Sequence, residues 1–202
     1  GTVTGVQTCA LPIFFDGEFF PAEVINKNIG ANILTVKSFS KTYAMTGWRV
    51  GFAYGEMSII KAMAKIQGQT TSCPNSISQK AAIAALDSDQ SFVESMKKEF
   101  LKRRNAMKRG LSSIEHIKIC VPGGAFYYFV DLSHYYNKTD KNGKIIKDSF
   151  DLSNYILDEA RVVTVAGDAF GAKNYIRLSF ATNEDIINKG INRIKKSLSE
   201  LK

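Results

Sequence analysis

Cysteine is scarce in this sequence of 202 residues, which contains only Cys9, Cys73 and Cys120. Their spacing matches neither a disulfide framework nor a metal site, so we expect no bound metal and a reducing, cytoplasmic location. Long apolar runs are also missing, since no stretch approaches the roughly 20 residues that would span a bilayer. Apolar residues at 45% and charged residues at 23% are ordinary values for a globular protein, and no membrane partner is expected.

The formal net charge is +8, yet the basic residues are not arranged in a way that predicts a nucleic-acid partner. The densest group is interpreted as one solvated face of a helix. It comprises Lys97, Lys98, Lys102, Arg103, Arg104, Lys108 and Arg109. We therefore expect no binding to nucleic acid.

Residues 1–13 read GTVTGVQTCALPI and differ in character from the rest of the chain. They have neither the charged start and apolar centre of a signal peptide nor a convincing periodic pattern. The run VTGVQTCALPI resembles the translation of a common sequencing adapter. We therefore expect this leader to be non-native and the natural sequence to begin near Phe14. The alternative is a natural strand between about residues 3 and 13.

The rest of the chain mixes strand and helix patterns, which predicts an α/β fold. A polar segment at 133–147, centred on Asn142-Gly143, is expected to be a surface hairpin or loop. Ser91 and Glu94 have the spacing of a capping box, which predicts a helix start. Strands are expected over 32–36, 117–121, 125–131, 162–165 and 175–181. Helices are expected over about 59–66, 76–86, 91–114, 152–160 and 187–201.

The most informative segment is Ser38 to Gly51, which reads SFSKTYAMTGWRVG. Two serines precede Lys41 after a strand, and Arg49 follows eight positions later, with Gly47 and Gly51 on either side of it. Serine and arginine hold phosphate through charge-assisted hydrogen bonds, and a lysine amine forms a Schiff base with a carbonyl cofactor. The pattern therefore suits a phosphorylated carbonyl cofactor, although a lysine in a surface loop is the alternative from these residues alone.

This segment is similar, position by position, to the lysine signature of the class I and II (fold-type I) pyridoxal-phosphate aminotransferases, the group that includes aspartate and aromatic aminotransferases. The resemblance implies that Lys41 binds pyridoxal 5'-phosphate (PLP) covalently and acts as the catalytic residue. It also implies that Ser38 and Arg49 bind the cofactor phosphate, with Ser40 as a further cofactor-binding candidate.

A second segment, Tyr175 to Ala181, reads YIRLSFA and has the alternation of a strand. Ile176 and Leu178 can pack into the core while Arg177 points to the opposite face. An arginine on an edge strand in solvent is the plain alternative. The family's strand at this place supplies the arginine that binds the substrate α-carboxylate, so the resemblance implies this substrate-binding role for Arg177. A guanidinium suits it because two parallel N–H groups match two carboxylate oxygens.

The resemblance runs from about Phe14 to Lys202 and corresponds to the C-terminal part of such an enzyme. It implies a partial large, PLP-binding domain at 14–88, an interdomain helix at 89–115 and a small C-terminal domain at 116–202, after the leader at 1–13. In the family, an Asp-x-x-Tyr pair upstream of the lysine contacts the cofactor ring, and here that pair would fall within the leader. Asp16 is no replacement, because it lies in the Asp16-Gly17 turn beyond the expected position.

The resemblance thus implies an aminotransferase that moves an amino group from an L-amino acid to a 2-oxo acid and that is a homodimer at full length. Because the phosphate loop, the stacking ring and the Asp-x-x-Tyr pair of the family are missing, we expect this chain to be inactive by itself. Two alternatives stay open. One is another PLP enzyme of the same fold, such as a C–S β-lyase or a cyclopropane-forming synthase, and the other is a non-catalytic module.

Overall fold

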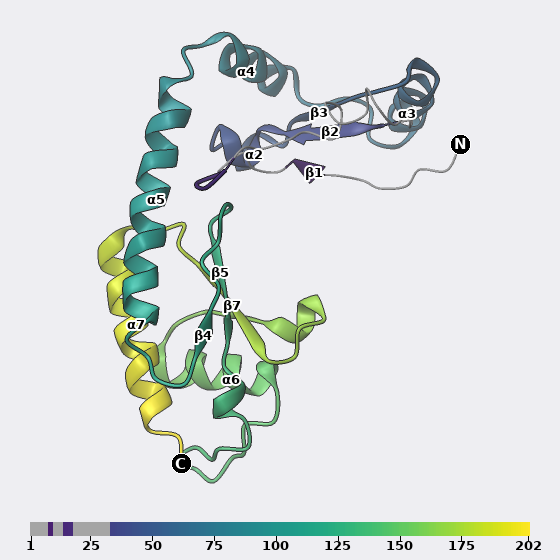
Figure 1. The fold of residues 1–202 in the computed structure, drawn as a ribbon. Coiled ribbons are helices and arrows are strands. Elements are labelled where there is room, and N and C mark those ends of the chain that lie inside the picture. Colours follow the sequence, from purple (N-terminus) through teal and green to yellow (C-terminus); the bar gives the residue numbers. More distant parts are fainter. Residues whose placement is uncertain (1–7, 10–13, 18–32) are drawn as a thin grey trace. The chain divides into compact units, whose positions relative to one another are not determined.

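The computed structural model describes residues 8–9, 14–17 and 33–202. The chain divides into two compact units, residues 1–95 (unit 1) and residues 96–202 (unit 2), and each is described by itself. Helix α5 (Ser91–Leu111) contains the boundary between them and leads into unit 2 (Figure 1). The domain limits predicted from the sequence, at 14–88, 89–115 and 116–202, stay a prediction.

Unit 1 contains a three-stranded sheet in the order β1-β2-β3. Strand β1 (Thr8–Cys9) is parallel to β2 (Thr35–Ser38), which is antiparallel to β3 (Gly51–Tyr54). The strand predicted over 32–36 instead runs through Ser38, because the pairing of Ser38 with Gly51 extends the ladder to that point. Only Thr35 is buried in it. A close approach of the two strands requires glycine at 51, since a Cβ there would lie 2.6 Å from the Lys37 carbonyl oxygen.

The predicted leader coincides with β1, whose register pairs Thr8 with Val36. Residues 1–7 and 10–13 lie outside the described residues. Strand pairing uses backbone groups that every residue except proline provides, so a two-residue strand is compatible with either origin of this segment.

Among its described residues, the helices that lie wholly in unit 1 are the short α2 (Phe39–Thr42), the 3₁₀ turn η2 (Thr46–Trp48), α3 (Met57–Thr70) and α4 (Ser76–Asp87). The predicted helices over 59–66 and 76–86 are confirmed. Several large apolar side chains of α3 and α4 are nevertheless exposed. These are Met57, Met63, Ile66, Ile77, Ile83 and Leu86.

A small apolar cluster fixes the segment after β2. Phe39, Met45, Val50 and Ala82 are its buried members, and Tyr43 packs against them. The Tyr43 hydroxyl donates to the Gln90 side-chain carbonyl at 3.0 Å. The segment between β2 and β3 is therefore anchored on α4 rather than free in solvent.

Unit 2 contains an antiparallel sheet in the order β4-β5-β7-β6. Its strands are β4 (Lys118–Ile119), β5 (Tyr127–Asp131), β6 (Val165–Ala166) and β7 (Tyr175–Ser179). The predicted strands are confirmed in β5 and β7. Strands β4 and β6 are shorter than predicted, and β6 begins only at Val165, because that is where pairing with Arg177 of β7 starts.

One face of this sheet is core, with Tyr128, Val130, Ile176 and Leu178 all buried. Helices α5 and α7 (Glu184–Ser199) lie side by side next to the sheet (Figure 1). They pack closely at Gly110 of α5, because a Cβ added there would lie 2.7 Å from the Cδ1 of Ile191 in α7. The final helix is confirmed.

The segment between β5 and β7 carries shorter elements. They are the 3₁₀ turns η3 (Ser133–Tyr135) and η5 (Gly167–Phe170), helix α6 (Ser149–Tyr155) and the π-helical turn η4 (Ile156–Ala160). The helix predicted over 152–160 is therefore a helix that starts earlier and ends as a π turn. The predicted surface hairpin is confirmed by the bridge between Thr139 and Ile145, with Gly143 at φ 85°.

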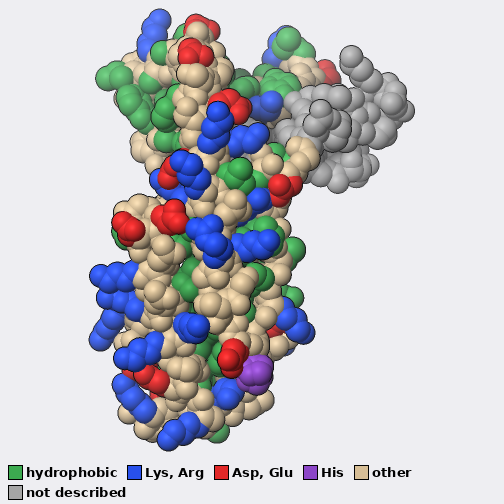
Figure 2. Space-filling view, turned by 60° about the vertical axis from the view of Figure 1, so that its left-hand side comes forward, with side chains coloured by type: hydrophobic (Ala, Val, Ile, Leu, Met, Phe, Trp, Pro, Cys, Tyr) green, Lys and Arg blue, Asp and Glu red, His purple; other side chains and the backbone are tan. Residues whose placement is uncertain are grey.

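The helix start predicted at Ser91 is confirmed, since α5 begins at that residue. Ser91 is the first helical residue rather than the cap, because the Glu94 N–H bonds to the Gln90 carbonyl and Ser91 donates to the Asp89 carboxylate. One expectation about α5 is wrong. Arg104 is buried, not on a solvated face, since its guanidinium donates to the Pro122 carbonyl at 3.1 Å. Elsewhere Lys and Arg side chains are scattered over the surface that Figure 2 shows.

Candidate functional site

Ser38 and Ser40 form the first part of the candidate site, at the end of β2. Ser38 caps α2, with its Oγ accepting from the Ser40 N–H at 3.1 Å and donating to Ser40 Oγ at 2.9 Å. Both side chains are half-buried. The buried Phe39 between them packs into the core, so the chain turns here and the two hydroxyls come together.

Arg49 lies two residues before β3, and its backbone has a left-handed conformation with φ 51°. Left-handed backbone is uncommon outside glycine and asparagine and is maintained by its surroundings. Here the buried Val50 and the paired Gly51 follow at once, and the guanidinium donates to the Thr46 carbonyl at 3.0 Å. The rest of the exposed guanidinium can meet a ligand.

Ser38, Ser40 and Arg49 meet in one open groove of about 380 Å³. Lys37 and Gln67 also line it, and no carboxylate is found among the described residues of its lining. Two hydroxyls, a guanidinium and an ammonium make this groove suitable for a phosphate dianion. The structure thus brings together three of the four residues predicted to bind the cofactor.

Lys41, the fourth, follows Ser40 directly within α2 and is half-buried. It does not line the groove itself. A cofactor whose phosphate occupied the groove would therefore extend beyond it to meet the Lys41 amine.

Arg177 lies in unit 2, on the face of the sheet opposite to the core. Its Cζ lies over two aromatic rings, 4.5 Å from the centroid of Tyr127 and 4.8 Å from that of Phe170. Within the described residues its guanidinium has no carboxylate or carbonyl partner. Sequence reasoning assigned no role to either ring, although strand alternation in β5 could have placed Tyr127 on the face of Arg177.

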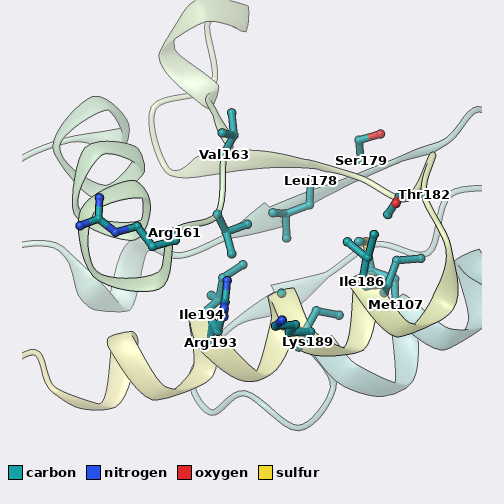
Figure 3. Close-up of a pocket in the computed structure, with 14 residues that line it drawn as sticks. Met107, Arg161, Val163, Leu178, Ser179, Thr182, Ile186, Lys189, Arg193 and Ile194 are labelled. Carbon is teal, nitrogen blue, oxygen red and sulfur yellow. The ribbon is translucent and has the colours of Figure 1, made fainter.

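Unit 2 also has an apolar pocket of about 420 Å³ along α7 (Figure 3). Leu178 and Ile187 contribute to its apolar lining, and Arg161, Lys189 and Arg193 line it with basic side chains. It contains none of the predicted site residues. Gly190 also lines it, and a Cβ at that position would lie 3.9 Å from the Val162 side chain.

The sequence predicts no catalytic or binding role for the two histidines, but they lie in contact with each other. His116 and His134 stack with ring centroids 4.0 Å apart, in the patch that Figure 2 shows in purple. Desolvation lowers the pKa of His134, and the positive charges of His116 and Lys138 lower it further. Among the described residues no group of three or more His, Cys, Asp or Glu side chains could hold a metal ion.

No helix in the described ranges is both long and apolar enough to span a bilayer.

Comparison with known proteins identifies the chain's relatives. The family model "Aminotransferase class I and II" matches residues 13–194. An aspartate aminotransferase of Rhizobium meliloti strain 1021 is 41% identical over 191 residues, which are 94% of this chain and 46% of that protein. A probable aspartate/prephenate aminotransferase of Rickettsia prowazekii is 39% identical over 188 residues, or 93% of this chain and 47% of the relative.

The comparison with solved structures gives relatives of the same kind. The crystal structure of the Rhizobium meliloti aspartate aminotransferase superposes with a TM-score of 0.89 at 39% identity, covering 94% of this chain and 48% of that one. The chain thus has the expected α/β fold of the C-terminal part of a fold-type I enzyme. It spans about half the length of the relatives that it matches.

Proposed function

Because the chain belongs to the class I and II aminotransferase family, we propose that it forms part of a PLP-dependent enzyme that moves an amino group from an L-amino acid to a 2-oxo acid. The observation that carries this proposal is the groove in which Ser38, Ser40 and Arg49 meet next to Lys41. The names of the relatives make aspartate the first amino donor to test.

In this proposal the groove holds the cofactor phosphate. The serine hydroxyls and the Arg49 guanidinium donate to its oxygens, and Lys37 adds positive charge at the rim. Arg49 can do so because one nitrogen donates to the Thr46 carbonyl while the guanidinium as a whole remains exposed. The bound cofactor supplies the electron sink that stabilises a carbanion at the substrate Cα.

Lys41 contributes the amine. Its place one residue beyond the groove suits an attachment to the aldehyde carbon of a cofactor whose phosphate lies at Ser38. As a free amine, Lys41 would take a proton from the substrate Cα and deliver it to the carbon that had carried the cofactor's aldehyde oxygen, as a general acid–base group. Such a group typically contributes about 10²–10⁴-fold to a rate.

Arg177 binds the substrate α-carboxylate. Its contacts with Tyr127 and Phe170 are cation–π contacts, which leave the N–H groups available. A carboxylate can then accept two parallel hydrogen bonds, which fixes its orientation as well as its charge.

We further propose that the complete enzyme is a cytoplasmic homodimer and that residues 14–88 and 116–202 belong to its large and small domains. The exposed apolar side chains of α3 and α4 support an incomplete large domain, since large apolar patches usually mark an interface. Because upstream parts of the family's site are not found in this chain, we propose that the chain alone does not catalyse amino transfer.

Covalent labelling tests the cofactor site without relying on activity. The chain is incubated with PLP and reduced with borohydride, and the modified lysines are located by peptide mass spectrometry. We expect Lys41 to be labelled at lower PLP concentrations than the exposed Lys65, and prior phosphate to suppress the labelling at Lys41. Lys65→Ala serves as the matched control for Lys41→Ala. Labelling spread evenly over the lysines, with or without phosphate, would reject the site.

Activity is tested in a chimera that joins the upstream half of the Rhizobium meliloti enzyme to residues 33–202. Conversion of aspartate and 2-oxoglutarate to oxaloacetate and glutamate is expected, and Lys41→Ala should abolish it. Release of pyruvate and ammonia from a cysteine-type substrate, without amino transfer, would instead identify a β-lyase.

A further inference from the structure

We propose that Tyr127 and Phe170 are positioning residues, which hold the Arg177 guanidinium in place for a carboxylate ligand. Together they are named the aromatic clamp. This inference rests on the proposed role of Arg177 and adds the residues through which that role is prepared.

The geometry of the clamp is the first argument. Both rings lie within 5 Å of the Arg177 Cζ, at 4.5 Å for Tyr127 and 4.8 Å for Phe170, inside the roughly 6 Å range of cation–π attraction. The rings come from separate elements, since Tyr127 begins β5 and Phe170 ends η5. Two independent contacts restrict the guanidinium more than one contact could.

The choice of aromatic partners is the second argument. Arginines in proteins are commonly held by carboxylates, which neutralise the charge and occupy the N–H groups. Arg177 has no such partner among the described residues, although it is half-buried. Aromatic faces attract the cation but accept none of its in-plane hydrogen bonds, so both the charge and the donors remain available to an external carboxylate.

The rigidity of Phe170 is the third argument, because an exposed ring on a loose turn would position nothing. Its 3₁₀ turn is tied to α6, where the Ser149 hydroxyl donates to the Asp168 carboxylate at 2.6 Å and accepts from the Asp168 N–H at 3.0 Å. Phe129 also meets the Phe170 ring edge-on, at a centroid distance of 6.1 Å, and stacks on Tyr175 at 4.8 Å.

The proposal is tested on the 202-residue chain by NMR of arginine side chains, with the Arg177 Nε–H signal assigned from its loss in Arg177→Lys. The order parameter of this bond measures positioning directly, without any ligand. Pyruvate, as a small 2-oxo acid, is then titrated to measure the affinity of Arg177 for a carboxylate. The variants are Tyr127→Leu, Phe170→Leu and both together, with Tyr127→Phe and Phe170→Tyr as ring-conserving substitutions.

Phe150→Leu is the matched control, because Phe150 is 54% exposed, close to the 52% of Phe170, and has no contact with Arg177 among the described aromatic and cation–π pairs. We expect each leucine variant of the clamp to lower the order parameter and to weaken pyruvate binding about 2- to 5-fold, as a cation–π contact of about 0.5–1 kcal/mol implies. The ring-conserving variants and the control should stay within about twofold of the parent chain.

The outcomes separate the two proposals. If Arg177→Lys weakens pyruvate binding while the leucine variants leave both the order parameter and the affinity unchanged, the clamp is rejected and the role of Arg177 stands. If the leucine variants loosen the Arg177 side chain but Arg177→Lys leaves pyruvate binding unaffected, the clamp exists and the carboxylate role fails. An ordered Arg177 in the double leucine variant refutes the clamp whether or not pyruvate binds.

Discussion

Gly167→Ala is expected to destabilise unit 2 strongly, because the position has no space for a side chain. A Cβ at Gly167 would overlap the carbonyl oxygens of Ala172 and Tyr175 and lie 2.9 Å from the Tyr175 carbonyl carbon. These are backbone atoms, which cannot move aside as the end of a flexible side chain can. The turn η5 and the start of β7 would have to separate.

The cost has two contributions. Overpacking of a tight site typically costs about 1–3 kcal/mol, and contact with two carbonyl groups favours the upper part of that range. Separation would also stretch the hydrogen bond from the Ala172 N–H to the Gly167 carbonyl, now 2.9 Å, which is worth about 1 kcal/mol. We therefore expect a loss of about 3 kcal/mol in the free energy of unfolding.

Gly171→Ala is the matched control in the same turn. Gly171 has φ 74° and a Cβ there would have nothing within 4 Å, so only the left-handed backbone opposes alanine, at a cost of about 1 kcal/mol. Urea unfolding followed through the backbone amide NMR signals of β5 and β7 reports on unit 2, whereas the single tryptophan, Trp48, lies in unit 1. If Gly167→Ala costs no more than Gly171→Ala, the steric argument is wrong.

Helix stability, pH dependence, cofactor labelling and turnover can each be tested as well. Gly68→Ala in α3 should raise the stability of unit 1 by up to about 1 kcal/mol in urea unfolding, since a Cβ there meets nothing within 4 Å and alanine is the better helix former. Unit 2 should lose stability as the pH falls through about 6.5: the folded-state pKa of His134 is lowered, so the unfolded chain takes up the proton first, and His134→Gln should flatten the dependence of the urea midpoint on pH. Ser38→Ala should reduce severalfold the labelling of Lys41 by PLP that prior phosphate suppresses. The substitution removes a hydrogen-bond donor to the phosphate and also the N-cap of α2, and such a cap stabilises a helix by about 1 kcal/mol. The chain alone should convert no amino acid to its 2-oxo acid at an ordinary enzymatic rate in a coupled assay, and robust turnover that is lost in Lys41→Ala would contradict the proposed incompleteness.

Some features of the site can be predicted from the sequence because they are local. The segment from Ser38 to Gly51 resembles the lysine signature of the family, and the turn after a strand brings the two hydroxyls together within three residues. The alternation in β7 likewise separates the buried Ile176 and Leu178 from Arg177. The roles of these residues belong to the proposed function.

Some expectations failed where neighbours distant in sequence decide the outcome. Arg104 has the sequence context of a solvated helix face, yet a carbonyl 18 residues away accepts its hydrogen bond and the side chain is buried. The end of β2 at Ser38 likewise depends on pairing with Gly51 beyond the intervening loop. Helix and strand periodicity contains no information about such partners.

The sequence by itself thus determined the family, through its resemblance to a known signature, and the α/β fold, because motifs and residue periodicity are properties of neighbouring residues. Only the tertiary structure decided that Tyr127 and Phe170 both lie against Arg177 and that Gly167 admits no side chain. The reason is physical: these contacts join separate elements, so they exist only after strand register and loop closure have brought those elements together.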